Sequence, residues 1–108
     1  LSGDDPLTIP MMAVGAKGVI SVASNIAPKP LVKMTRLALD NKFVEARKIH
    51  KKYYRLFCDL FIDTNPIPVK AAMAMMGLGL ETYRLPLCPM SAARREQLRD
   101  CLSELDLV

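Results

Sequence analysis

The sequence predicts an α/β fold in which a short βαβ piece is followed only by helices. Three observations support this: a polar loop directly after Leu1-Ser2, a β-branched apolar run over residues 18–22, and helical spacing of apolar residues from residue 28 onward. Two parallel strands alone cannot form a stable sheet, because their edges stay unpaired. We therefore expect the chain to be the last part of a larger α/β protein.

Composition excludes several classes of protein. The 108 residues are 51% hydrophobic, which suits one small packed domain and not a disordered segment. No apolar run reaches the roughly 18 residues of a membrane span, and residues 1–5 lack the basic start of a signal peptide. Cys58, Cys88 and Cys101 have no CxxC spacing, so we expect thiols in a reducing cytosol and neither a disulfide framework nor a zinc site.

The first third of the chain has the pattern of a βαβ unit. Leu1-Ser2 reads as the tail of a strand and residues 3–5 as a loop. A helix is expected from about Thr8 to the helix-ending Gly15. The run Gly18–Val22 is short and β-branched, which predicts a strand buried on both faces, as in a parallel sheet.

Residues 28–62 are predicted to form two helices. The first buries Leu31, Met34 and Leu37/Ala38 and ends at Asp40-Asn41. The second covers residues 42–62, with apolar residues at helical spacing. Its apolar positions are Phe43, Ala46, Ile49, Tyr53, Leu56 and Leu60.

Residues 63–108 are predicted to add two more helices. Two prolines after residue 62 end the preceding helix, and Asn65 is a candidate N-cap. A short apolar helix follows and ends at Gly77 or Gly79, and residues 81–90 form an extended connector. The last helix has Ser91 as its N-cap, and its apolar stripe is Leu98, Leu102 and Leu105.

Four motifs occur in order along the chain: SGDD, GAKGVISVASN, NPIPVKAAM and RLPLCPM. In this order and spacing they closely resemble the C-terminal part of the dihydrodipicolinate synthase (4-hydroxy-tetrahydrodipicolinate synthase) family. That family belongs to the pyruvate-dependent Schiff-base aldolase/lyase superfamily. The resemblance covers essentially the whole chain. Sibling lyases such as N-acetylneuraminate lyase share the architecture, but we expect a different strand there in place of GVISV.

The resemblance implies a (β/α)8 TIM barrel followed by a C-terminal helical domain. Residues 1–41 would be the final βα units, with Leu1-Ser2 ending strand seven and Gly18–Val22 forming strand eight. Residues 42–108 would be the helical domain. Because a complete barrel needs about 250 residues, roughly six βα units would precede this segment.

The resemblance also implies an activity for the parent enzyme. A lysine on strand six would form a Schiff base with pyruvate, and the enamine would attack aspartate semialdehyde in lysine and diaminopimelate biosynthesis. The expected enzyme is a cytoplasmic homotetramer that needs no metal and no cofactor beyond the covalent pyruvate–lysine intermediate. Lys17, Lys29 and Lys33 do not occupy the matching position, so this segment contains no catalytic residue and should be inactive alone.

Two substrate-binding positions carry over from the family. Gly3 matches the end of strand seven, where the backbone approaches bound pyruvate. Ile20 matches the strand-eight position whose carbonyl faces the catalytic lysine and the substrate. Neither role requires a reactive side chain, since a glycine allows close approach and a carbonyl can orient an amine.

The remaining polar residues have simpler interpretations. Asp4 and Asp5 could form an acid/base pair, but a helix cap and a solvated loop are favoured. His50 has no partners for a metal site and is expected on a helix surface, and the methionines are expected as core or subunit-contact residues. A basic cluster is expected to be a solvated helix face. Its members are Arg47, Lys48, Lys51, Lys52 and Arg55.

The net charge of +4 permits contact with nucleic acid but does not argue for it. Two alternatives to the synthase therefore stay open at this point. One is a sibling Schiff-base aldolase, and the other is a stand-alone basic helical module that binds nucleic acid or protein.

Overall fold

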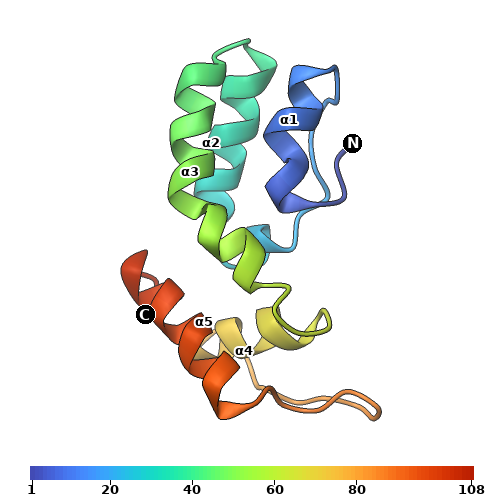
Figure 1. The fold of residues 1–108 in the computed structure, drawn as a ribbon, viewed down its shortest axis with the longest axis vertical. Coiled ribbons are helices and arrows are strands. Elements are labelled where there is room, and N and C mark those ends of the chain that lie inside the picture. Colours follow the sequence, from blue (N-terminus) through green and yellow to red (C-terminus); the bar gives the residue numbers. More distant parts are fainter. The chain divides into compact units, whose positions relative to one another are not determined.

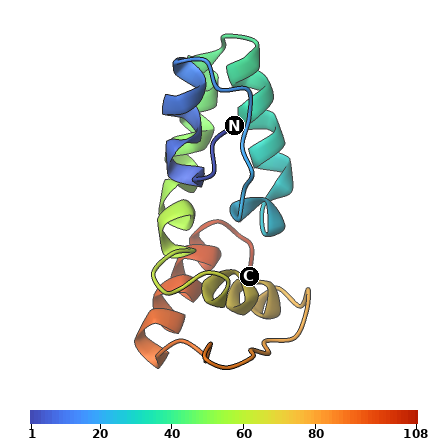
Figure 2. The same ribbon diagram turned by 90° about the vertical axis from the view of Figure 1, so that its right-hand side faces the viewer.

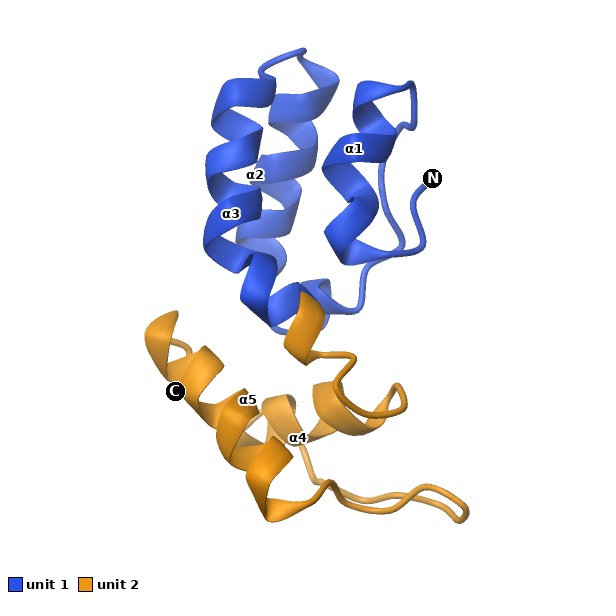
Figure 3. Cartoon of the chain, viewed as in Figure 1, with its two compact units in different colours: residues 1–57 blue, residues 58–108 orange.

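A computed structural model describes residues 1–108, and it is mostly helical with no strand. The chain divides into two compact units, residues 1–57 and 58–108 (Figure 3). In chain order the elements are η1 (Asp5–Leu7), α1 (Thr8–Ala13), η2 (Ala23–Asn25), α2 (Pro28–Leu39), α3 (Phe43–Asp59), α4 (Ile67–Met75) and α5 (Ala92–Glu104). The predicted division into residues 1–41 and 42–108 concerns a longer protein and stays a prediction.

The first unit contains α1, α2 and most of α3, with α2 and α3 forming a helical hairpin (Figures 1 and 2). The predicted apolar face of α2 is confirmed, since Leu31, Met34 and Ala38 are buried. The helix ends where expected. Asn41 takes the left-handed conformation at φ 59°, and the amide of Lys42 donates to the carbonyl of Leu37 at 2.8 Å.

The helix after the first loop is also confirmed. α1 begins at Thr8 and ends at Ala13, and Gly15 follows with φ 113°, a backbone conformation that strains side-chain-bearing residues. A 3₁₀ turn, η1, precedes α1 and contains Pro6 in its first turn.

The prediction of a strand at Gly18–Val22 is wrong for this chain. The segment makes one isolated parallel bridge, between Ser2 and Val19, and the side chain of Ile20 is 74% exposed. A strand buried on both faces needs neighbouring strands and covering layers. The only neighbour here is the short stretch around Ser2, so the β-branched run makes one bridge without becoming a strand, and Val22 already has helical backbone angles before η2.

The second unit contains α4 and α5, which pack against each other. Ile67, Val69, Ala71 and Ala72 of α4 are buried. The predicted stop at Gly77 is confirmed, because this residue has φ 75° and the following amide of Leu78 donates to Met73.

The two predicted caps in this unit had different outcomes. Ser91 is the N-cap of α5, and its hydroxyl accepts a hydrogen bond from the amide of Arg94 at 3.4 Å. Asn65 is not a cap: α4 begins at Ile67 with Pro66 in the N-cap position, and no side chain caps the helix. Asn65 lies one residue too early, on the far side of Pro66.

The remaining predictions for this unit are confirmed. Leu98 and Leu102 are buried and Leu105 is half-buried, and residues 81–90 contain no helix or strand. None of the helices has the length and apolar character required to cross a membrane.

Candidate functional site

The backbone of Ser2 joins the two loops that the sequence analysis singled out. Its amide donates to the carbonyl of Gly18 at 2.8 Å, and its carbonyl accepts from the amide of Ile20 at 2.9 Å. These two bonds form the parallel bridge of Ser2 with Val19. Gly3 follows Ser2 directly, so the two predicted substrate-binding positions, Gly3 and Ile20, lie on neighbouring segments that run in the same direction.

Asp5 makes a second connection between the same two loops. Its side chain is 1% exposed. One carboxylate oxygen accepts from the Ser21 hydroxyl, and the other accepts from the amides of Val22 and Ala23, both at 3.0 Å. Asp5 is therefore a cap, but for the distant turn η2 and not for the helix that follows it in sequence. The expectation that it lies in a solvated loop is wrong.

Asp4 differs from its neighbour in exposure and in role. Its side chain is exposed, whereas its backbone is held by two hydroxyl groups. Ser2 Oγ and Thr8 Oγ1 donate to the Asp4 carbonyl at 2.8 and 3.2 Å, and the Asp4 amide donates to Ser2 Oγ at 3.1 Å. With Asp5 occupied by three donors, the two aspartates do not form an acid/base pair.

The two predicted substrate-binding residues are both accessible. Gly3 is exposed, and a Cβ added to it would meet no atom within 4 Å. Packing inside this chain therefore does not require a glycine at position 3. Ile20 is exposed as well. This arrangement offers backbone amides and carbonyls, which can bind and orient a ligand through hydrogen bonds but form no covalent bond with it.

No cluster of three or more His, Cys, Asp or Glu residues is arranged to hold a metal ion. Cys58 and Cys88 are exposed and Cys101 is buried, and none of the three forms a disulfide.

His50 is less exposed than predicted. It is half-buried on α3, with its ring centroid 5.4 Å from that of Tyr54 and 6.0 Å from that of Phe57. Burial lowers the pKa of His50 below the ordinary value of 6.5. The sequence prediction failed because position 50 borders the apolar face of α3, on which Phe57 lies two turns later.

The basic cluster on α3 is exposed at all five positions, as expected for a solvated helix face. The methionines differ in burial, and their expected role in subunit contact stays a prediction. Met12 is buried, whereas Met73, Met75 and Met76 are half-buried.

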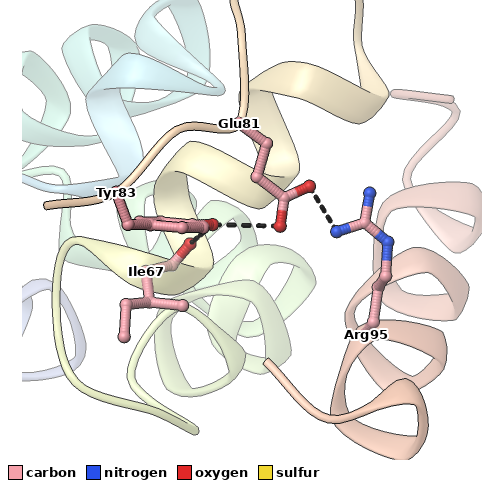
Figure 4. A network of polar contacts seen from close by, with 4 residues as sticks. All are labelled: Ile67, Glu81, Tyr83 and Arg95. Carbon is pink, nitrogen blue, oxygen red and sulfur yellow. Dashed lines mark hydrogen bonds and ion pairs between the residues drawn. The ribbon is translucent and has the colours of Figure 1, made fainter. Parts of the chain in front are cut away.

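The second unit contains a polar network that was not predicted from the sequence (Figure 4). The Tyr83 hydroxyl faces two acceptors, the Ile67 carbonyl at 3.2 Å and a Glu81 carboxylate oxygen at 3.0 Å, and Arg95 pairs with the other Glu81 oxygen. Burial and then the Glu81 carboxylate raise the pKa of Tyr83 to about 12. The network attaches the extended connector to α4 and α5. The alternation of Glu81 and Tyr83, which share a face in extended backbone, could have predicted it.

Two neighbouring loops that present backbone groups beside a parallel bridge, followed by helices, are typical of the closing part of an α/β protein with its site at strand ends. The particular family follows from comparison with known proteins. The sequence matches the dihydrodipicolinate synthetase family over residues 1–105, and the chain belongs to this family.

Individual relatives agree with this assignment. A curated protein from Sulfurihydrogenibium sp., named 4-hydroxy-tetrahydrodipicolinate synthase, is 58% identical to the chain over 110 residues. The match covers 100% of the chain but 37% of that protein, so the chain spans a little over a third of its relative's length.

Two solved structures show the same fold for this segment. The dihydrodipicolinate synthase of Aquifex aeolicus is 51% identical, with a TM-score of 0.97, over 99% of the chain and 36% of its own. The enzyme of Acinetobacter baumannii, solved in complex with pyruvate, is 39% identical, with a TM-score of 0.95, over 99% of the chain and 37% of its own. These relatives give no support to the two alternatives, a sibling aldolase or a stand-alone nucleic-acid-binding module.

Proposed function

We propose that this chain is the C-terminal segment of a lyase that condenses pyruvate with aspartate semialdehyde in lysine and diaminopimelate biosynthesis. The observation that carries the proposal is the match over the whole chain, at 58% identity, to a protein named 4-hydroxy-tetrahydrodipicolinate synthase. The relative solved with pyruvate adds support for the first substrate.

In this proposal the extended segments at Ser2 and Gly18–Val22 are strands seven and eight of a (β/α)8 barrel. The parallel direction of the Ser2–Val19 bridge supports it, because all strands of such a barrel are parallel. The exposure of Ile20 supports it too, since the remainder of the barrel would cover this apolar side chain.

The proposed roles of Gly3 and Ile20 follow from their positions. The Gly3 backbone approaches bound pyruvate, and the Ile20 carbonyl orients the lysine amine that forms the Schiff base. The open space around Gly3 supports its role, because nothing within this chain requires a glycine there. The reactive lysine comes from strand six, upstream of this segment. Burial and neighbouring cations would keep part of its amine deprotonated, as a nucleophile must be.

The proposal extends to the assembly and its setting. The covalent pyruvate–lysine intermediate takes the place of a cofactor, and the chemistry requires no metal. The enzyme is proposed to be a cytoplasmic homotetramer, with the half-buried methionines of α4 as candidate contact residues.

Borohydride trapping tests the Schiff base in the full-length protein. We expect pyruvate plus borohydride to add one reduced pyruvate per subunit by mass spectrometry and to abolish activity. The 108-residue segment provides the control, since it lacks the strand-six lysine and should gain no mass. A full-length protein that gains no mass would refute the proposal.

The acceptor is tested separately, because trapping reports only the pyruvate half of the reaction. We expect full-length protein loaded with pyruvate to consume aspartate semialdehyde in preference to the acceptor aldehyde sugars of sibling lyases. Preference for a sugar aldehyde would keep the Schiff-base mechanism and overturn the substrate assignment.

A further inference from the structure

We propose that Asp5 is a positioning residue for the reaction: by holding the Ser21 hydroxyl and the amides of Val22 and Ala23, it keeps the preceding Ile20 carbonyl in the geometry that substrate binding requires. This inference rests on the proposed function, because it concerns how Gly3 and Ile20 are held in place. Asp5 itself has no contact with the substrate in this proposal.

The bonds of Asp5 fall directly after Ile20. Its carboxylate accepts from Ser21, Val22 and Ala23, the three residues that directly follow Ile20. The Ser21 hydroxyl is itself placed by the segment, since it also accepts from the amide of Ser24 at 2.9 Å. The backbone immediately after Ile20 is therefore held by a buried side chain from the other loop.

Ser2 makes a second connection to the same segment. Its amide donates to the Gly18 carbonyl and its carbonyl accepts from the Ile20 amide, so the Ile20 amide is held directly before the residues that Asp5 holds. Ile20 thus lies between two attachment points. Gly3 does as well, because it lies between Ser2 and Asp5 along the chain. Hydrogen bonds close this arrangement into a ring that contains both proposed contact residues.

Few other contacts within these 108 residues hold the ring. Ile20 is 74% exposed and no atom lies within 4 Å of a Cβ at Gly3, so apolar packing inside this segment fixes neither position. Asp5, in contrast, is 1% exposed, and hydrogen bonds to a charged group are stronger than neutral ones. Removing the carboxylate would leave two buried or half-buried amides without their acceptor, and the segment would shift to satisfy them.

The expected consequence is a change in substrate binding and not in the identity of the reaction. Displacing a positioning group by about 1 Å can cost on the order of a hundredfold in rate. Because the Gly3 backbone approaches pyruvate and the Ile20 carbonyl orients the lysine amine, the effect should appear as a higher KM for pyruvate together with a lower kcat.

Asp5→Ala in the full-length enzyme is the test, with Asp4→Ala as its matched control. The control removes the adjacent, exposed carboxylate and keeps the backbone bonds of Asp4. Rates are divided by the concentration of sites that borohydride and pyruvate can trap, so misfolded protein does not count. We expect Asp5→Ala to lower kcat/KM for pyruvate by about 10- to 100-fold per site and to raise KM. Asp4→Ala should stay within about twofold.

Two further variants separate positioning from stability. Asp5→Asn keeps an oxygen for the two amides and should recover most of the lost kcat/KM. Ser21→Ala removes one of the three donors and should show the same shift in KM at smaller size, which provides a test even if Asp5→Ala does not fold.

If Asp5 and Ser21 had a structural role alone, Asp5→Ala and Ser21→Ala would reduce the number of trappable sites and leave the KM for pyruvate unchanged. That result would overturn the inference. Failure of the proposed function looks different, since the unmodified full-length protein would then trap no pyruvate.

Discussion

The loops of residues 1–25 and the α4–α5 pair are held together by different interactions. In the first region the buried polar residues Ser2, Asp5 and Thr8 are at most 1% exposed, and each makes hydrogen bonds within or between the loops. In the second region Ala71, Leu98 and Leu102 are fully buried, and apolar contact joins the two helices.

The difference separates two requirements of a protein. Apolar burial supplies most of the free energy of folding but is not directional. Hydrogen bonds contribute less net free energy, yet they fix distances and directions between particular atoms. The region that contains the candidate site is the one held by directional contacts.

The largest expected effect on stability lies in the apolar region. Leu98→Ala removes a fully buried side chain of α5 and should lower the free energy of unfolding by about 2–5 kcal/mol, measured by urea denaturation of the full-length protein. Leu80→Ala is the control, since its side chain is 84% exposed, and should change stability by less than about 0.5 kcal/mol. Equal effects of the two substitutions would contradict the contrast between the regions.

An intermediate effect is expected in the polar region. Asp5→Ala leaves the amides of Val22 and Ala23 without their acceptor, a cost of about 1–3 kcal/mol. Hydrogen exchange should therefore accelerate at residues 22–23 by about tenfold or more. Amides of Leu98–Leu102 in the same variant serve as the control. Acceleration there as well would mean that the hydrogen bonds of Asp5 also stabilise α5.

The smallest expected effect concerns the connector. Because the folded protein holds the Tyr83 proton more tightly than the unfolded chain, the stability from this contact is full below pH 10 and is lost as pH rises toward 12. Tyr83→Phe should therefore show a shallower loss of stability than the unmodified protein over this range, measured by urea denaturation at a series of pH values.

Local sequence signals predicted the helices well, because the groups that end a helix are close to it in sequence. Gly77 and Asn41 supply the left-handed conformations after α4 and α2, and Ser91 caps α5 three residues from its donor. Asn65 fits the same rule by type, but the helix begins after Pro66 and its side chain is out of reach.

The candidate site required information that local rules do not contain. Asp5 caps a turn 18 residues later, and no cap rule links positions so far apart. The prediction of a strand over residues 18–22 failed for a related reason. Composition predicts that such a run will be buried but not which neighbours will bury it. Gly3 and Ile20 came from family motifs, and their proximity came from the bridge of Ser2.

The single parallel bridge has a consequence for aggregation. Residues 18–21 contain the β-branched pair Val19 and Ile20, with Ile20 exposed, and they pair with Ser2 at one point. Such an edge is a template for strand addition from a second molecule, and the nearest residue that would discourage it is Lys17, which lies just before the run. When these residues are separated from the partners that normally pair with them, self-association through this edge competes with folding.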